Sequence, residues 1–164
     1  MILPRNNYAF IDGQNLYLSI KKLGWKLDYR KFRIYLWEKY GVGKAYVFIG
    51  FIESNQSLYD DLARWDFEPV FRPVTIGADG KIKGNIDADL VLRAVIEFKN
   101  YNKAIIVSSD GDFYSLVKYL NDKQKLGAVL SPDVKNCSWL LRKAAGDKIW
   151  FMDELRRKLE YKSQ

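Results

Sequence analysis

The stretch Ala104-Ile-Ile-Val-Ser-Ser-Asp-Gly-Asp-Phe-Tyr114 decides the fold, because one element ends in it and another begins. Its first four residues form a short apolar run, typical of a strand buried on both faces of a parallel sheet. Two serines and two aspartates follow around Gly111. A helix is predicted after them, because apolar residues recur at intervals of three and four: Phe113, Leu116, Val117 and Leu120. Asp110 and Asp112 therefore lie where a strand gives way to a helix, the edge at which open α/β sheets bind ligands.

A second stretch near the start has the same design. The apolar run Tyr8-Ala-Phe-Ile11 ends on Asp12 and Gly13, and a helical pattern follows until Gly24. The carboxyl ends of parallel strands meet at one edge of a sheet, so we expect Asp12 and Asp110 to lie close together.

Strands alternate with helices along the rest of the chain. Strands are predicted at 45–49, 68–71, 125–130 and 149–151, and helices at 29–40, 54–65, 86–98 and 138–144, with Asp28, Ser54 and Asn85 as candidate caps. Asp79-Gly80 predicts a hairpin that projects from the sheet, and a basic helix is predicted at 153–162. This alternation predicts a single α/β domain over 1–164, with its core at about 8–151 and a mainly parallel sheet covered by helices on both faces.

Composition excludes several classes of protein. Of the 164 residues 48% are hydrophobic and 15% aromatic, which favours a packed core over disorder. No apolar run is long enough for a membrane span, and the first residues lack the pattern of a secretory signal. Cys137 is the only cysteine, which excludes an internal disulfide and a multi-cysteine zinc site. We therefore expect a cytoplasmic protein without a membrane partner.

The absence of histidine restricts the chemistry further. It excludes Ser-His catalysis, a histidine general base and histidine-ligated metals. Chemistry near neutral pH must then depend on carboxylates, Lys, Tyr or a hard metal bound by oxygen atoms. The net charge of +7 favours a polyanionic partner such as nucleic acid.

The helix predicted at 86–98 carries two aspartates with different expected positions. Asp87 lies above an apolar stripe and should point toward the sheet edge; the stripe consists of Leu90, Val91, Ala94 and Phe98. Asp89 shares another face with Arg93 and Glu97, a spacing typical of exposed ion pairs. Asp87 is therefore the stronger candidate for a site with Asp12 and Asp110. Several carboxylates in one place favour binding of a cation, and an oxygen-only ligand set favours Mg²⁺ or Mn²⁺. Such an ion supports hydrolysis of phosphodiesters.

Three motifs in order resemble those of the NYN domain, in the LabA-like branch of the PIN-like nucleases. They are Phe10-Ile-Asp-Gly-Gln-Asn15, Lys83-Gly-Asn-Ile-Asp87 with the following Ala88-Asp-Leu-Val-Leu, and Val107-Ser-Ser-Asp-Gly-Asp-Phe113. The resemblance runs from about Tyr8 to about Phe151. It implies a three-layer, Rossmann-like (PIN-like) fold and RNA cleavage that depends on Mg²⁺ or Mn²⁺. It also implies that the metal ligands are Asp12, Asp87, Asp110 and Asp112, that Asn15 steadies the first loop, and that Ser108 and Ser109 hydrogen-bond a carboxylate or phosphate.

The chain departs from the family pattern at one position. Many relatives carry another acid about two turns into the third helix, where this sequence has Leu92-Arg93. That departure fits one metal rather than two, a weaker enzyme, or a protein of the same fold that binds RNA without cutting it. Partial substitution by Asp89 is the alternative, although its helical phase argues against it. Each acid also has a structural interpretation: Asp112 as a helix cap, Asp87 as a first-turn acid that favours the helix dipole, and Asn15 as a local cap.

Basic and aromatic residues near the predicted edge are candidates for RNA contacts. The candidates for phosphate contacts are Arg72, Lys81 and Lys83 at the hairpin, and Lys135, Arg142 and Lys143 near the carboxyl edge. Tyr114, Trp139 and Trp25 are candidates for stacking on unpaired bases, with burial in the core as the alternative. Single-stranded RNA is the expected partner, and the sequence leaves a homodimer open.

Two other enzyme classes fit less well. Haloacid-dehalogenase phosphatases need a second acid two residues after the first aspartate, where this chain has Gln14. Toprim domains place a glutamate after the first strand, where this chain has Asp12. The alternative that remains is an RNA-binding module without nuclease activity.

Overall fold

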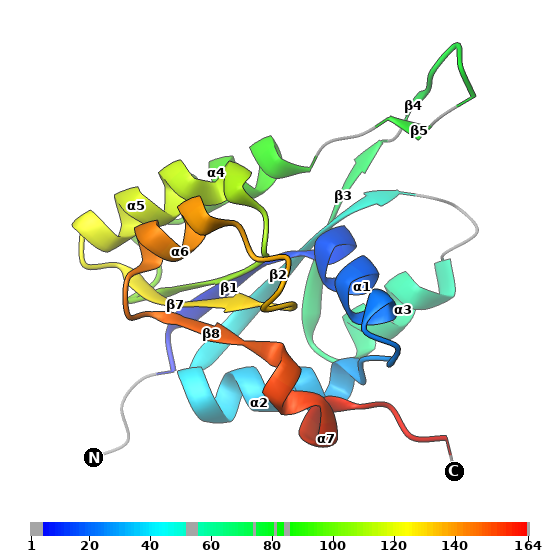
Figure 1. Ribbon diagram of the computed structural model, residues 1–164, viewed down its shortest axis with the longest axis horizontal. Helices are drawn as coiled ribbons and strands as arrows, with labels where there is room; N and C mark the ends of the chain where they lie inside the picture. Colours follow the sequence, from blue (N-terminus) through cyan, green and yellow to red (C-terminus); the bar gives the residue numbers. More distant parts are fainter. Residues whose placement is uncertain (1–4, 52–55, 74, 81, 84–85, 164) are drawn as a thin grey trace.

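The computed structural model describes residues 5–51, 56–73, 75–80, 82–83 and 86–163, and it contains one six-stranded parallel sheet between two layers of helices (Figure 1). The strands of the sheet are β1 (Asn7–Asp12), β2 (Val42–Phe51), β3 (Phe67–Pro73), β6 (Ala104–Val107), β7 (Leu126–Ser131) and β8 (Ile149–Phe151). The helices are α1 (Gly13–Lys22), α2 (Tyr29–Tyr40), α3 (Gln56–Arg64), α4 (Asp87–Ile96), α5 (Tyr114–Asp122), α6 (Trp139–Ala145) and α7 (Arg156–Leu159). The predicted three-layer, mainly parallel α/β fold is confirmed, and every neighbouring pair in this sheet is parallel.

The strand order is β3-β2-β1-β6-β7-β8. The chain thus begins in the middle of the sheet, moves outward to β3, and then crosses back to place β6 on the other side of β1. Its course reverses between β1 and β6, and the loops that leave these two strands run in opposite directions. Such a switch point opens a crevice at the carboxyl ends of the strands.

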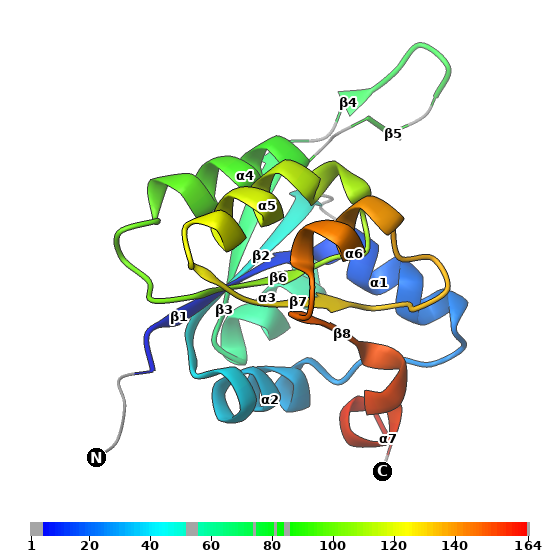
Figure 2. The same ribbon diagram turned by 60° about the vertical axis from the view of Figure 1, so that its left-hand side comes forward.

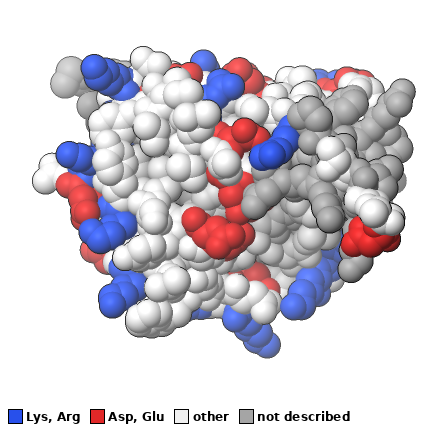
Figure 3. All heavy atoms as spheres, turned by 90° about the horizontal axis from the view of Figure 1, so that it is seen from above, with Lys and Arg blue, Asp and Glu red and all other residues white. Residues whose placement is uncertain are grey.

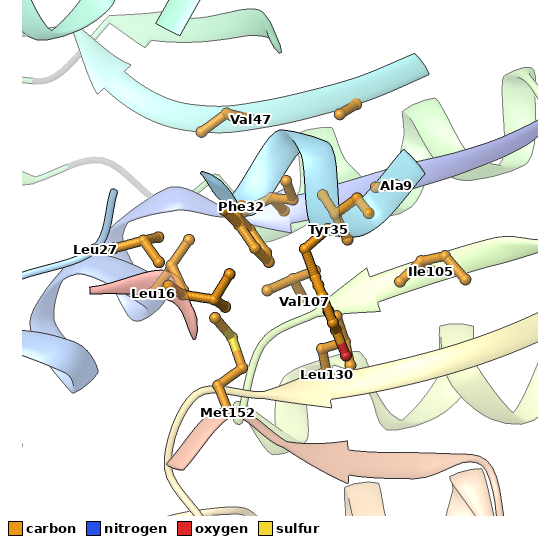
Figure 4. Close-up of a cluster of buried hydrophobic side chains, with 14 of the residues drawn as sticks. Ala9, Leu16, Leu27, Phe32, Tyr35, Val47, Ile105, Val107, Leu130 and Met152 are labelled. Carbon is orange, nitrogen blue, oxygen red and sulfur yellow. The ribbon is translucent and has the colours of Figure 1, made fainter. Parts of the chain in front are cut away.

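Two hydrophobic clusters fill the spaces between the layers. One packs α1, α2, α3 and α7 against the sheet, and the other packs α4, α5 and α6 against its opposite face. Figure 2 shows these helices on the two sides, and Figure 4 shows part of the first cluster, with Leu16, Phe32, Val107 and Met152 converging between strands and helices.

Side-chain alternation along β1 determines where Asp12 points. Ala9 and Ile11 belong to the cluster on the α1 side, and Phe10 belongs to the cluster on the α4 side. Successive side chains of a strand face opposite ways, so Asp12 has the same orientation as Phe10. The carboxylate of Asp12 is thereby directed toward the layer that contains α4.

Several predicted boundaries are confirmed, with small shifts. β8 has the predicted limits, and α2 begins after the predicted cap Asp28, whose side chain accepts a hydrogen bond from the Lys31 N–H at 3.0 Å. The predicted hairpin consists of β4 (Thr75–Ile76) and β5 (Ile82–Lys83), which pair antiparallel outside the main sheet. The candidate caps Ser54 and Asn85 lie outside the described residues.

The predicted basic helix at 153–162 is wrong in its extent. The chain forms a 3-10 turn at Met152–Leu155 and then α7, which ends at Leu159. Beyond it Glu160 pairs with Leu27, and the Tyr161 N–H donates to the Lys26 carbonyl at 2.8 Å. These backbone bonds to the loop between α1 and α2 replace the bonds that a longer helix would form. Within the described ranges, no helix has both the length and the apolar character needed to cross a bilayer.

Candidate metal centre

Asp12 ends β1 and caps the helix that follows. Its carboxylate is 5% exposed and accepts two hydrogen bonds, from the Asn15 N–H at 3.1 Å and from the Ser108 hydroxyl at 3.3 Å. The first bond satisfies a free N–H group of the first turn of α1. The second ties β1 to the end of β6. Asp12 is therefore held in one orientation from both strands.

The end of β6 positions the second carboxylate. Ser108 is fully buried, and its hydroxyl also accepts a hydrogen bond from the Asp110 N–H at 3.1 Å. Asp110 in turn accepts from the Asp112 N–H at 2.9 Å and caps the 3-10 turn at Gly111–Phe113. The capping residue is thus Asp110, not Asp112. Of the two roles predicted for Ser108, the structure shows the contact with a carboxylate.

Asn15 connects the two loops. The Ser109 N–H donates to its amide oxygen at 3.0 Å, and its amide nitrogen donates to the Ser109 hydroxyl at 3.0 Å. Ser109 is itself buried, so the amide replaces water as the partner of its backbone. Asn15 thus links the loop after β1 to the end of β6, and the side-chain cap of α1 is supplied by Asp12.

Asp87 supplies the third carboxylate, from the first turn of α4. Leu90 and Ala94 of the same helix are buried, and Val91 and Phe98 pack against them, so the predicted apolar stripe is confirmed. Because this stripe packs on the sheet, Asp87 points toward the sheet edge. The Asp12 side chain points from that edge toward the layer that contains α4, so the two carboxylates approach each other. Asp12, Asp87 and Asp110 each offer an oxygen atom, and these three atoms lie within 4.8 Å of one another.

This spacing fits a small divalent cation. Ligand oxygens lie about 2.1 Å from Mg²⁺, so two oxygens on opposite sides of an octahedral ion are about 4.2 Å apart. Small side-chain rotations would bring the three aspartates to that separation. Hard oxygen ligands of this kind suit Mg²⁺ or Mn²⁺.

The protonation behaviour of the acids reflects their crowding. Burial raises the pKa of the Asp87 carboxyl to about 6, and the negative charges of Asp110, Asp12 and Asp112 contribute in that order. Burial also raises the pKa of Asp12, while its hydrogen bonds from Asn15 and Ser108 act in the opposite direction. A bound cation would remove this repulsion and favour the ionised forms.

The acids line an open cavity of about 400 Å³, which also contains Gln14, Asn15, Ile86 and Asp112. Asp112 is exposed on this cavity, outside the group of three clustered oxygens. Figure 3 shows acidic residues gathered near the middle of one face, with most lysines and arginines of that face toward its margins. Gln14 was not predicted as a site residue, although its position between Asp12 and Asn15 in the first motif was a usable signal.

The neighbours of Asp87 on α4 take other roles. Asp89 pairs with Arg72 of β3 at 3.6 Å, not with Arg93 as its spacing suggested. The guanidinium of Arg93 instead lies over the Tyr46 ring, 5.1 Å from its centroid. Leu92 and Arg93, which replace the additional acid of many relatives, are therefore not part of the acidic cavity. Lys81 lies outside the described residues, as does the side chain of Lys83.

The other candidates for RNA contacts differ in how exposed they are and in which residues they contact. Arg142 donates to the Val134 carbonyl and lies 4.8 Å from the centroid of Phe151. The ring of Trp139 is 67% exposed, with the Lys143 ammonium 5.1 Å from its centroid, whereas Trp25 is 8% exposed and belongs to the core. Tyr114 is half-buried, and Lys135 is exposed. Trp139 is thus the candidate whose ring is most open to solvent.

Comparisons with known proteins agree with the fold and the motifs. In structure, the chain is similar to a protein of unknown function from Vibrio parahaemolyticus, with a TM-score of 0.77 and 22% identity, over 98% of this chain and 100% of that one. No curated protein matches. The sequence profile of the NYN domain matches residues 8–152. This range includes all three motifs and the six strands of the main sheet, except the first residue of β1. The chain therefore belongs to the NYN domain family.

Proposed function

We propose that this protein is a ribonuclease that hydrolyses phosphodiester bonds of single-stranded RNA with the help of Mg²⁺ or Mn²⁺. The observation that carries the proposal is the convergence of three carboxylate oxygens within 4.8 Å, from residues that lie 75 and 23 positions apart in the chain (87 − 12 and 110 − 87). Repulsion among them is unfavourable in the absence of a cation. Membership of the NYN family, whose members are generally nuclease-like, supports the same chemistry.

Asp12, Asp87 and Asp110 would hold the ion, and Asp112 lies at the edge of the same cavity. An ion bound there would activate water and offset the charge that develops on the phosphoryl oxygens. Ser108 and Asn15 hold Asp12 in place, and the Asp112 N–H holds Asp110. Such fixed ligands reduce the reorganisation that the reaction requires.

RNA is supported as the substrate by charge and by the position of the cavity. The net charge of +7 attracts a polyanion, whereas the acids themselves repel it in the absence of metal. The cavity is open to solvent at the sheet edge, so an unpaired strand can reach the acids.

The competing function is RNA binding without cleavage. The observation that favours it is Leu92-Arg93 at the position where many relatives carry a further acid. A binding module would retain its affinity for RNA in EDTA and lose it steeply as salt is raised. A nuclease would bind and cut, with cutting restricted to solutions that contain the metal.

Cleavage of a fluorescent single-stranded RNA with Mn²⁺, Mg²⁺ or EDTA tests the proposal. We expect cutting in either metal and none in EDTA. Asp110→Asn should lower the rate by more than the roughly 10- to 100-fold typical of residues that only orient metal ligands. The asparagine oxygen can still accept the bond from the Asp112 N–H, so the fold should be kept, and thermal unfolding would check this.

Asp89→Asn is the matched control. It also removes one aspartate near the cavity, but Asp89 pairs with Arg72 and is not one of the clustered acids. Its rate should stay within about twofold of the wild type. A folded Asp110→Asn that cuts as fast as Asp89→Asn would refute the nuclease assignment.

A further inference from the structure

A second cavity adjoins the acids and shares Asn15 and Asp110 with the acidic cavity. It measures about 430 Å³, within the usual range of ligand pockets, and lies between α1, the end of β6 and the loop that leads into α6. Because the two cavities share these residues, a chain molecule bound at the acids can continue past Asp110 into the second cavity without leaving the surface.

The lining of the second cavity differs in charge from that of the first. Lys22, in the last turn of α1, contributes an ammonium group, whereas the described lining of the acidic cavity contains no lysine or arginine. Asp133 also lies here, but it is buried and accepts from the Lys135 N–H at 3.0 Å and from the Asn136 amide. Asp133 thus orients Asn136. Asp110, which this cavity shares with the acidic one, is half-buried, and Lys22 is the exposed cation of the described lining.

The polar groups of this cavity are available to a ligand. Among the described residues, the ammonium of Lys22 and the hydroxyls of Ser19 and Ser138 have no hydrogen-bond or ion-pair partner. The amide oxygen of Asn136 is likewise without one. Of the two acids in this lining, Asp110 belongs to the proposed metal cluster and Asp133 is buried and hydrogen-bonded to Lys135 and Asn136. The exposed cation of Lys22 beside neutral donors and acceptors then suits a phosphate joined to a ribose and a base.

The far wall of the cavity is fixed relative to the acids. The Ser138 N–H donates to the Ser109 carbonyl at 3.0 Å, so the start of α6 is tied to the residue before Asp110. A Cβ atom on Gly111 would lie 2.4 Å from the Ser138 hydroxyl oxygen, which shows how closely the two segments approach. Trp139, with its exposed ring, follows Ser138 directly. The distance between this wall and Asp110 is therefore determined by the fold and not by a mobile loop.

We infer that the second cavity binds the nucleotide next to the scissile phosphate, with its outer phosphate at Lys22 and its ribose or base at Asn136 and Ser138. This inference rests on the proposed ribonuclease function. The strand would run from the three acids over Asp110, through this cavity and toward the ring of Trp139. The contacts recognise the backbone and one sugar or base edge, so they position the strand without selecting a long sequence.

Lys22 and Lys21 form a matched pair for the test. They are adjacent in the chain and carry the same charge, but Lys21 lines a different, apolar cavity and its ammonium lies 5.8 Å from the centroid of Tyr17. Lys22→Ala and Lys21→Ala therefore reduce the net charge equally, while only the first changes the proposed subsite. Both side chains are exposed, and thermal unfolding should show equal stability.

The first measurement is affinity for a fluorescent single-stranded RNA, by anisotropy in EDTA, where no cutting occurs. We expect Lys22→Ala to weaken binding about fivefold to tenfold, as for loss of one charge-assisted phosphate contact, and Lys21→Ala by less than twofold. The second measurement is cleavage in Mn²⁺, in which Lys22→Ala should raise KM by a similar factor and leave kcat within about twofold.

The outcomes separate this inference from the proposed function. Equal affinities for the two variants would overturn the subsite whatever the cleavage assay gives. Where repulsion by the metal-free acids prevents binding of the wild type in EDTA, equal KM values for the two variants would overturn it. If the wild type binds but does not cut, and Lys22→Ala alone weakens binding, the ribonuclease function fails and the RNA subsite stands. If the wild type cuts and the two variants have the same KM, the function stands and the subsite is refuted.

Discussion

Replacing Asp87 with asparagine should make the metal-free protein more stable, although it removes a proposed metal ligand. Burial, followed by the negative charges of Asp110, Asp12 and Asp112, raises the pKa of the Asp87 carboxyl from 3.8 to about 6. Each pKa unit corresponds to about 1.4 kcal/mol, so a fully shielded carboxylate with this shift would destabilise the ionised native state by about 3 kcal/mol. The side chain is partly open to solvent, which screens the repulsion, so we expect asparagine to raise the free energy of unfolding by about 1 kcal/mol at pH 7.5.

The effect should depend on pH in a defined direction. The pKa of Asp87 is higher in the native state than its ordinary value of 3.8, so between about pH 4 and pH 6 the native protein binds more protons than the unfolded chain. Protonation of Asp87 therefore raises the free energy of unfolding of the wild type as the pH falls from about 6 to about 4. The advantage of Asp87→Asn over the wild type should be complete above pH 6 and disappear near pH 4.

Thermal unfolding in EDTA and in Mn²⁺ tests this reasoning. In EDTA at pH 7.5 the variant should melt about 2 to 4 °C above the wild type, the shift expected for about 1 kcal/mol in a chain of this length. Added Mn²⁺ should raise the Tm of the wild type by mass action and leave that of the variant almost unchanged, so the order reverses.

Asp89→Asn provides the reference, because it also removes an acid from the first turn of α4 and with it the favourable interaction with the helix dipole. Asp89→Asn also breaks the half-exposed ion pair with Arg72, worth about 0 to 1 kcal/mol, so the wild type is measured beside both variants. If Asp87→Asn melts no higher than the wild type and Asp89→Asn in EDTA, or if its advantage is the same at pH 4 and pH 7.5, burial and the neighbouring charges do not destabilise the ionised Asp87 as described.

Three further predictions concern metal binding and the scaffold. The Mn²⁺ affinity of the wild type should fall about tenfold per pH unit below pH 6, because Asp87 must lose its proton to bind the ion; calorimetry that gives one Kd from pH 5 to 7.5 would contradict this. Asn15→Ala removes the amide that holds the Ser109 backbone, so urea unfolding should show a loss of about 1 to 2 kcal/mol together with a lower kcat. Arg33→Ala leaves the carbonyl oxygens of residues 42 and 43 without their donor and should cost about 3 to 4 kcal/mol in urea unfolding, whereas recovery by Arg33→Lys would argue against the forked geometry.

The main features of the fold and the acidic cluster could be predicted because their determinants are local. Apolar runs marked β1 and β6, one followed directly by Asp12 and the other by two serines and Asp110, and the parallel arrangement then brought both acids to one edge. The position of Asp87 followed from helical spacing alone, since Leu90 and Ala94 on the same stripe are buried. These inferences require only the periods of strands and helices.

The remaining features depend on contacts between distant segments. Asn15 and Ser109 are 94 residues apart, and no local pattern reveals that one amide holds the other loop. Arg72 pairs with Asp89 only because β3 brings it alongside the first turn of α4. The end of α7 at Leu159 is likewise set by backbone bonds to Lys26 and Leu27, which compete with continuation of the helix.

The reversal of the chain between β1 and β6 creates the crevice at the sheet edge independently of the side chains that line it. The crevice exists because the connections on either side of that point diverge, and it would persist if every carboxylate at its floor were exchanged for a neutral side chain. Loss of the acids would remove the proposed metal site and leave the groove itself in place. A related protein that lacks the acids could therefore still bind a single strand of RNA in this groove, without cutting it.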